Sequence, residues 1–455
     1  MFVRSLRGTA ASALHRALSH PVTRAAAGFT ALTSLVKAVA FLKEAVVASA
    51  FGVGSSMDSY LMALVVIGFP SGVLVNAAQT VFIREYVRVV DVNGDAVASR
   101  FLREAVLGLV LALTALLVIW VAFLPSILAV VGHGLDGAQR TLVAANVYRL
   151  IPYYYLNGIN LLGYGVLQAR RAFLRSALIP ILTPLVTIAL IASAGGNLNF
   201  LIGALTLGTG LETVFIVFQM VRFHRGGGES AVHPSQRVRE FTWGTLALVP
   251  GTLFASLAPV IEQTIASGLG HGAISALGYA GKLPSTLNSL LTTAVGVTIL
   301  PYFAQRLVQG YDESCRRFFI RYATLMALVG TFVAMAAVLG SEPFVRVAFQ
   351  RGQFSPADTL LVTALQRAYL WQLPGAMAAM VATRFIAAQG RYRLLALGSM
   401  LMVPVTGLVQ WSLSTLWGPQ GLAFGTSVGN ALSAMMLLYL ALRVPLETAV
   451  PREAR

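Results

Sequence analysis

The sequence predicts an all-α polytopic membrane protein of about twelve transmembrane helices, arranged as two pseudo-symmetric six-helix lobes around a central cavity. Three observations predict this class: an apolar composition, an alternation of arginine clusters, and an internal repeat. Of the 455 residues, 57% are hydrophobic and 11% are charged, less than half the charged fraction of a typical soluble domain. One span needs roughly 20 apolar residues, so twelve spans leave no room for a soluble catalytic domain.

The apolar runs divide the chain into lobes and connecting segments. We expect spans at residues 28–51, 59–83, 104–126, 142–167, 173–195, 198–221, 241–267, 273–303, 318–340, 359–387, 393–415 and 420–442. The domains are then an amino-terminal segment (1–27), an N-lobe (28–222), a linker (223–240), a C-lobe (241–443) and a tail (444–455). The linker contains Gly226, Gly227, Gly228 and Pro234, which disfavour a continuous helix.

Arginine clusters fall on alternate sides of these spans. The loops that follow the even-numbered spans are rich in arginine, whereas the opposite loops hold only Arg140, Arg346 and Arg351. By the positive-inside rule, both termini are cytoplasmic and the number of spans is even. The formal charge of +16 therefore reflects membrane topology, and we expect no nucleic-acid partner. The amino-terminal segment lacks the apolar core and cleavage site of a signal peptide, so we expect it to be retained.

The two predicted halves repeat each other. Three residues near the first loop recur 216 positions later, where Gly52, Gly54 and Ser59 are matched by Gly268, Gly270 and Ser275. Pro70–Ser71 recurs as Pro284–Ser285 and Gln168–Arg170 as Gln389–Arg391 at similar offsets. Because each half has an even number of spans, the halves run in the same direction and a site is expected at their interface.

Charged residues inside predicted spans are the candidate site. The chain has three lysines, Lys37, Lys43 and Lys282, and all three lie within spans. A cation at the bilayer centre costs at least about 2.5 to 3.5 kcal/mol, so such residues usually face a cavity or a partner. We expect the lysines to bind substrate together with Arg149 and Arg367. Three acids are candidates for ion coupling or ion pairing: Glu44, Asp58 and Glu262.

The spacing of the first-span charges favours a cavity. Lys37 and Glu44 are seven residues apart and share a helix face, whereas Lys43 is rotated by about 120° from Lys37. In the alternative interpretation, Lys37 or Lys43 forms a structural ion pair with Glu44 or Glu262. The sequence has no phosphate-binding loop motif and no metal-ligand cluster, so we expect no cofactor and no metal. The six histidines lie outside the spans, and we expect them to be solvated.

The first span and its loop resemble a known family signature. The run VKAVAFLKEAVVA at residues 36–48 is followed by FGVG at 51–54. Together they resemble the signature of the MurJ (MviN) lipid II flippase family, whose two arginines and two aspartates fall on Lys37, Lys43, Glu44 and Asp58. Lys282 falls on a further family arginine and is followed nineteen residues later by Pro301, at the end of the run Gly296–Pro301, which resembles a family motif. Phe349–Phe354 resembles a loop of the family.

The resemblance implies the fold and substrate of the multidrug/oligosaccharidyl-lipid/polysaccharide exporter superfamily. The protein would be a monomer of the bacterial inner membrane without enzymatic activity, and its partners would be membrane lipids and an undecaprenyl-pyrophosphate-linked glycan, moved by alternating access. Three family arginines are lysines here, and the family's arginine pair has no counterpart in the stretch Pro70–Val75. These departures keep open a carrier of an exopolysaccharide or O-antigen repeat unit.

Two other classes are also open. A cation-coupled drug exporter of the same superfamily would favour a cavity with more acid than base, whereas the first span carries two lysines and one glutamate. A membrane glycan polymerase or ligase would need catalytic residues on a long outer loop, and the predicted outer loops are short.

The topology can be tested with reporter fusions. We expect fusions at Gly228, Ser314 and the carboxyl terminus to report cytoplasm, and fusions at Gly134 and Pro356 to report periplasm. A periplasmic carboxyl terminus would contradict the even number of spans.

Overall fold

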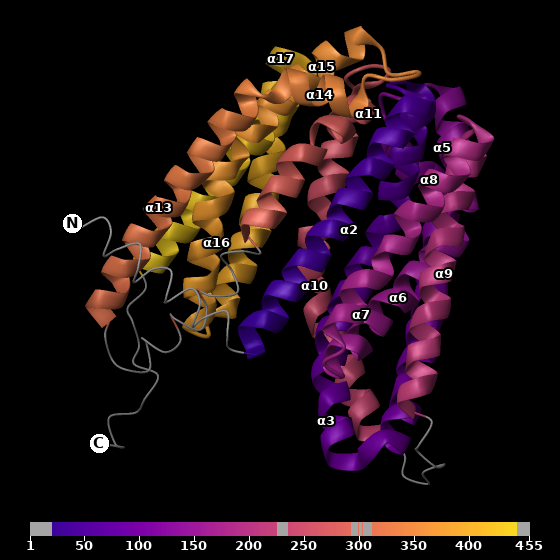
Figure 1. Cartoon of the computed structure of the whole chain (residues 1–455), viewed down its shortest axis with the longest axis vertical. Helices are drawn as coiled ribbons and strands as arrows, with labels where there is room; N and C mark the ends of the chain where they lie inside the picture. The colour runs from indigo at the N-terminus through magenta and orange to yellow at the C-terminus, as the bar shows by residue number, and fades with distance from the viewer. Residues whose placement is uncertain (1–20, 225–234, 293–298, 300–302, 304–311, 444–455) are drawn as a thin grey trace.

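The computed structural model describes residues 21–224, 235–292, 299, 303 and 312–443 (Figure 1). Within these ranges every regular element is a helix, which confirms the predicted all-α class. The first half contains α2 (Pro21–Phe51), α3 (Ser55–Ala122), α4 (Leu124–Val131), α5 (Gly137–Arg149), α6 (Ile151–Ala169), α7 (Phe173–Leu178), the 3-10 turn η1 (Ile179–Ile181), α8 (Leu182–Ala194) and α9 (Leu198–His224). The second half contains α10 (Ser235–Ser267), α11 (Ala273–Ala280), a helical segment at 282–292, α13 (Asp312–Leu339), α14 (Ser341–Phe349), α15 (Pro356–Leu370), α16 (Gln372–Ala388) and α17 (Tyr392–Arg443).

Two of these helices are hairpins of two antiparallel arms. In α3, Gly94 leaves helical geometry with φ 78°, and the rings of Phe82 and Phe101 stack 5.7 Å apart. On a straight helix, residues 19 positions apart would be separated by about 28 Å, so the stacking of these rings shows that α3 folds back on itself at Gly94. In α17, Gly418 has φ 59°, and the Gln410 amide donates to Thr426 Oγ1 at 2.9 Å. Each hairpin therefore accommodates two of the predicted spans.

Six helices of the described part of the chain are long and apolar enough to cross a membrane, and they include both hairpins: Ser55–Ala122, Phe173–Ser193, Leu198–Phe223, Ser235–Ser267, Cys315–Leu339 and Arg393–Arg443. Three other predicted spans are interrupted. The interruptions lie at Leu150, Gly281 and Trp371, each two or three residues before a proline. Proline cannot donate a backbone hydrogen bond and is best accommodated in the first turn of a helix, so a new helix begins at each of these sites. The span predicted at 273–303 also runs partly outside the described residues.

Several predicted boundaries also move. Helix α2 begins at Pro21, seven residues before the first predicted span, and α10 begins at Ser235, inside the segment predicted as a linker. The remainder of that linker (225–234), most of the amino-terminal segment and the tail lie outside the described residues.

The internal repeat is visible in the order and capping of the helices. Helices α2 and α10, which open the two halves, have 31 and 33 residues. Helices α5 and α15 both begin with a reciprocal capping box, formed by Asp136 with Gln139 and by Ser355 with Asp358. Each is followed, after one interrupting residue, by a longer helix, α6 or α16. Equivalent helices in the two halves thus have equivalent starts, as a duplication requires.

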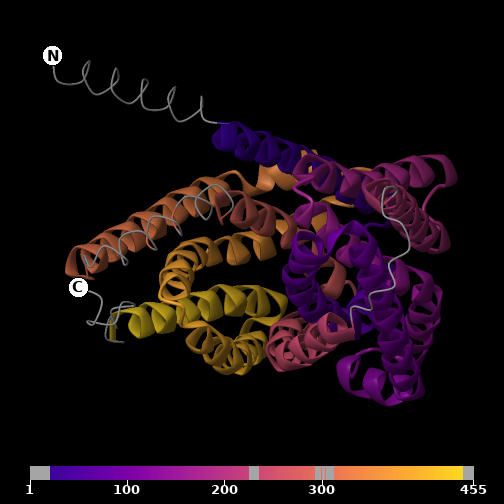
Figure 2. The same ribbon diagram turned by 90° about the horizontal axis from the view of Figure 1, so that it is seen from below.

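The helices form two groups that converge at one end. In Figure 1, α3 and α5–α9 lie on one side and α13–α17 on the other, and the groups diverge away from the end that carries α11, α14 and α15. Figure 2 shows α10 between the groups. Helix α10 packs on both: Thr252 Oγ1 donates to the Val73 carbonyl of α3 at 2.8 Å, and Ile261 lies against Gly407 of α17. Helix α10 is continuous and contains Pro250 and Pro259 in its interior.

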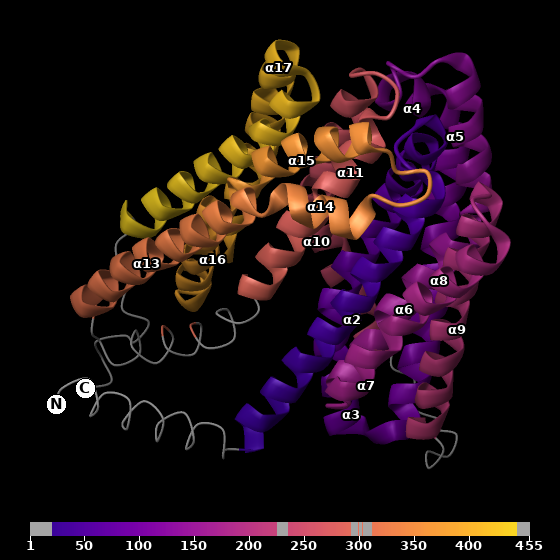
Figure 3. The same cartoon turned by 45° about the horizontal axis from the view of Figure 1, so that its top comes forward.

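Two glycine-containing loops close the convergent end. The connection between α14 and α15 reaches over the end of α2 (Figure 3), and the Gln353 N–H donates to the Ser49 carbonyl at 2.8 Å. A Cβ at Gly352 would overlap that same carbonyl oxygen. The equivalent loop of the first half places Gly134 against the backbone of Ser267, at the end of α10, with equally little space. Each half therefore closes over the first helix of the other half.

This packing predicts that a single methyl group opens the convergent end. We expect Gly134→Ala to separate the halves there, because its Cβ would overlap the Ser267 backbone, whereas the control Gly137→Ala meets nothing within 4 Å. Spin labels on cysteines that replace the exposed residues Ala138 and Ala357 would report the separation by pulsed electron paramagnetic resonance. A distance distribution that is the same in the two variants would contradict the proposed closure.

Candidate functional site

A carboxylate and two ammonium groups join the two halves near the middle of α2. Glu44 lies between Lys43 and Lys282: its Oε1 is 2.6 Å from Lys43 Nζ and 3.1 Å from Lys282 Nζ. Lys43 and Glu44 are on α2, whereas Lys282 begins the helical segment 282–292 of the other half. The structure thus brings Lys282 to two adjacent charged residues that lie more than 200 positions earlier in the sequence.

The third lysine lines a cavity next to this cluster. Lys37 Nζ donates a hydrogen bond to Ser289 Oγ on the segment 282–292. A cavity of about 280 Å³ opens here, and it is lined by Lys37, Ala40, Phe41, Glu44, Lys282, Ser285, Thr286 and Ser289. Lys37 and Glu44 share this cavity, as their seven-residue spacing predicts. We call this cavity the lysine cavity.

The lysine cavity carries an excess of positive charge. Its lining holds the ammonium groups of Lys37 and Lys282 and the Glu44 carboxylate. Lys43 does not line it but pairs with Glu44, so the cluster of three lysines and one glutamate has a formal excess of two charges. The side chains of Glu44, Lys43 and Lys282 are 15%, 23% and 35% exposed, so the cluster is largely withdrawn from solvent. Charge-assisted hydrogen bonds are strong in such surroundings, and an unpaired charge is costly. The arrangement therefore suits an anion with about two negative charges.

A second cavity continues from the first and shares Lys282 and Ser285 with it. Its volume is about 330 Å³, and Glu262, Gln263, Tyr369, Gln372 and Thr426 supply its other polar side chains. The Tyr369 hydroxyl donates to Glu262. Among the described residues Glu262 forms no ion pair, so the alternative pairing of a lysine with Glu262 is not observed, whereas the pairing with Glu44 is.

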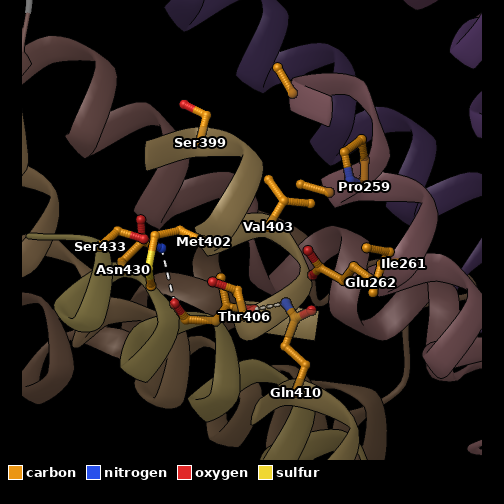
Figure 4. A pocket seen from close by; sticks show the side chains of 13 residues that line it. Pro259, Ile261, Glu262, Ser399, Met402, Val403, Thr406, Gln410, Asn430 and Ser433 are labelled. Atoms are coloured by element: carbon orange, nitrogen blue, oxygen red, sulfur yellow. Dashed lines mark hydrogen bonds between the residues drawn. The ribbon is translucent and has the colours of Figure 1, made fainter. Parts of the chain in front are cut away.

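Glu262 also reaches a third cavity, of about 400 Å³, between α10 and α17. Figure 4 shows its carboxylate directed toward Thr406 and Gln410 of α17. The Asn430 amide donates to the Thr426 carbonyl at 3.0 Å and helps to hold the α17 arm that lines this cavity. A continuous series of polar side chains thus leads from the lysine cavity into the second half.

Asp58 lies outside these cavities, at the convergent end. Its two carboxylate oxygens accept the backbone N–H groups of Gly272 and Ser275, at 2.6 and 2.7 Å, where α11 begins. In return, the Gly54 N–H near the start of α3 donates to Ser275 Oγ at 3.2 Å. Each half therefore caps a helix of the other, and a carboxylate is favourable at a helix amino terminus.

His271 belongs to the same contact, and its side chain is exposed, as its position outside the spans predicts. Its Nδ1 lies 2.9 Å from Gln139 Nε2 and 3.2 Å from Ser55 Oγ, so it bridges α5 and α3. In the sequence, the indication of this contact is that His271 directly follows Gly270 of the repeated motif.

The structure does not bring Arg149 and Arg367 to the lysines. Both side chains are exposed, and neither lines any of the cavities described above. Arg149 is the last residue of α5, where it faces Asn146 at 3.5 Å, and Arg367 lies in the last turn of α15. Each lies before the interruption of its predicted span, which is at Leu150 for Arg149 and at Trp371 for Arg367.

Most of the chain matches one known protein family. The profile described as "Lipid II flippase MurJ" matches residues 47–448, most of the sequence. The chain belongs to the MurJ family of lipid II flippases. A probable lipid II flippase MurJ from Rhizobium tropici is 25% identical over 73% of this chain and 64% of its own length. The lipid II flippase MurJ of Burkholderia cenocepacia is 24% identical over 91% of this chain and 82% of its own length. The chain thus spans slightly less than two thirds of the Rhizobium relative.

Solved structures support the same fold. A lipid II flippase MurJ in an inward closed conformation superimposes with a TM-score of 0.74 and 18% identity, over 90% of this chain and 87% of that chain. An inward-facing multidrug resistance MATE family transporter of the MOP superfamily gives 0.70 and 13%, over 91% and 97%. Together with the apolar helices, MurJ family membership makes the chain a multi-pass protein of the bacterial inner membrane.

The Glu44 cluster predicts non-additive effects on stability. We expect Glu44→Gln to lower the melting temperature of the detergent-solubilised protein, because Lys43 and Lys282 lose their counter-charge. Adding Lys282→Met should recover part of the loss, with a coupling of about 1 kcal/mol.

The control for these Glu44 and Lys282 variants is Glu342→Gln, which breaks the exposed ion pair with Arg346. It should change the free energy of unfolding by less than about 0.5 kcal/mol. Strictly additive effects of Glu44→Gln and Lys282→Met would show that the pair does not contribute to folding.

Proposed function

We propose that this chain flips an undecaprenyl-pyrophosphate-linked glycan, lipid II or a close relative, from the cytoplasmic to the periplasmic leaflet by alternating access. The observation that carries the proposal is the meeting of Lys37, Lys43 and Lys282 around Glu44, between the halves of a membrane-embedded MurJ family protein. It is transport without covalent chemistry, by a monomer, and it requires no cofactor.

The charge of the site favours a pyrophosphate. A pyrophosphate diester carries two negative charges, which equals the formal excess of the three lysines over Glu44. In the structure Glu44 occupies the position between two ammonium groups that a phosphate oxygen would share. Lysine offers a point charge with three donors in place of the planar fork of arginine, so it holds phosphate without fixing its orientation.

The closed convergent end supports alternating access. If both termini are cytoplasmic, the loop at Gly52–Gly54 is periplasmic, and the described state is closed toward the periplasm. Opening that end would require Asp58 to release the N–H groups of Gly272 and Ser275. The inside-negative potential favours outward movement of an anion by roughly 2.3 kcal/mol per charge per 100 mV. The same field draws the empty cationic site back.

Two alternative substrates follow from specific observations. The lysines that replace family arginines keep an exopolysaccharide or O-antigen lipid carrier open. The similarity to a MATE transporter suggests a cation-coupled drug exporter as a second candidate function, but the lysine cavity is lined by more basic than acidic side chains. We therefore favour an anionic, lipid-linked substrate.

The lysines provide the test. We expect Lys43→Ala and Lys282→Ala to abolish flipping while folded protein remains in the membrane, and we expect arginine at either position to retain much of the activity because the cavity charge survives. Transport of a lipid-pyrophosphate glycan in proteoliposomes, normalised to folded protein, is the measurement.

Alanine variants that transport at the wild-type rate would remove the main physical support for the proposed site. Alanine variants that fail to fold, and that fold again when Glu44 is also replaced, would instead identify the cluster as a structural ion pair.

A further inference from the structure

The first half contains a buried acid that the lysine cavity does not use. Glu212 lies at the middle of α9, a helix long and apolar enough to cross a membrane, and it is 7% exposed. Within the described part of the chain it forms no ion pair. Lysines hold Glu44 in the ionised form, and arginines hold Glu85. The charge of Glu212 depends instead on neutral groups.

Three neutral donors surround the Glu212 carboxylate. They come from α6 and α8, which lie beside α9 (Figure 1). The Tyr164 hydroxyl of α6 donates to Oε2 at 2.8 Å. The hydroxyl and the backbone N–H of Thr183, at the start of α8, both donate to Oε1, at 2.5 and 3.2 Å. A carboxylate that accepts from every neighbour is in its ionised form, because a protonated carboxyl group must itself donate.

The same neighbours accommodate the protonated form after one rotation. A proton on Oε2 can be donated to the Tyr164 oxygen once that hydroxyl turns its own hydrogen away. The bonds from Thr183 then end on a neutral oxygen, and such bonds are about half as strong as those to an ionised one. A metal ion does not fit here, because all three neighbouring groups direct hydrogens, and not lone pairs, toward the carboxylate.

Among the described residues, no charged side chain bonds to Glu212. The titratable groups that face it from α6 are Tyr164 and, at longer range, Tyr153. The group that faces it from α8 is Thr183. Arg175 of α7 donates instead to Gln219, which lies roughly 10 Å along α9 from Glu212. Uptake of a proton at Glu212 therefore changes the charge of this region without a compensating ion.

Glu212 also fastens α8 to α9 at a point of direct backbone contact. A Cβ at Gly208 would lie 2.6 Å from the Thr183 Cα. Beyond its other end, α8 leads to Gly196, where a Cβ would overlap the Ala50 carbonyl of α2. Ala50 is the residue next to the α2 carbonyl that the α14–α15 loop binds at the convergent end. One short helix thus connects the Glu212 carboxylate to the closure of that end.

We propose that Glu212 is a proton-binding site, and that uptake of a proton there favours opening of the convergent end. The ionised carboxylate holds the start of α8 by charge-assisted bonds, and the neutral carboxyl group holds it less strongly. This inference goes beyond the flippase proposal and does not depend on the identity of the substrate.

The test compares two pH values on the full-length protein in lipid nanodiscs. Spin labels on cysteines that replace Ala138 and Ala357 report the distance across the convergent end by pulsed electron paramagnetic resonance. We expect the ratio of open to closed molecules to be roughly fivefold higher at mildly acidic than at mildly alkaline pH. Glu212→Gln, which carries a neutral amide of nearly the same shape, should show the acidic distribution at both pH values. The matched control is Glu104→Gln, which breaks the pair with Arg100 and should respond like the wild type.

A second variant and a direct measurement address the site itself. Tyr164→Phe removes one donor from the ionised form and keeps the ring, so half of the change should occur at a higher pH than in the wild type. Infrared difference spectra between the two pH values should contain the carbonyl band of the protonated Glu212 carboxyl group. That band should be missing from the spectra of Glu212→Gln.

His271 is a titratable side chain at the convergent end itself, so His271→Gln separates the two sources of a pH response. A response that persists in Glu212→Gln and disappears in His271→Gln would overturn the inference. A wild-type distance distribution that is independent of pH would overturn it as well. Neither result bears on the lysine cavity, because the flippase proposal is tested by transport in the lysine variants.

Discussion

The central constraint on this protein is a cluster of ammonium groups that is largely withdrawn from solvent where its two halves meet. An isolated lysine there is costly, and Glu44 offsets two of the three by lying between Lys43 and Lys282. Because the two lysines come from different halves, the same carboxylate connects the halves and leaves a positive excess beside the connection. Affinity for an anion and cohesion of the two halves are therefore properties of one cluster. A substrate that competes for the lysines also acts on the contact between the halves.

At the convergent end, the two halves depend on backbone groups of each other. Asp58 accepts the N–H groups that begin α11, Ser275 accepts the Gly54 N–H, and glycine loops fit over the ends of α2 and α10. Such contacts are specific in geometry. Aromatic rings also pack across the two halves: Phe41 of α2 lies 5.5 Å from Phe344 of α14, and Phe241 of α10 lies 6.1 Å from Phe82 of α3.

The sequence predicted most of the fold because its signals are local. Hydropathy located the apolar segments, the repeat at Gly52 and Gly268 identified the duplication, and helical periodicity placed Lys37 and Glu44 on one face. The pairing of Glu44 with Lys282 could not be predicted, since it depends on how two distant helices approach. The interruptions at Leu150 and Trp371 lie next to Pro152 and Pro374. A proline near an apolar run is compatible with either a kink or a new helix, so the sequence alone does not show which of the two occurs.

Helix α10 limits how the halves can move. It is bonded to α3 through Thr252 and lies against α17 through Ile261, so one continuous helix is fastened to both groups. The two groups therefore cannot rotate apart as independent rigid bodies while α10 keeps its shape. The bending must be absorbed between its two attachments, where Pro259 cannot donate the backbone hydrogen bond that would stiffen the helix. If the protein works by the proposed alternating access, the bending stiffness of this single helix would set how readily one end opens and the other closes, independently of the affinity of the site for its substrate.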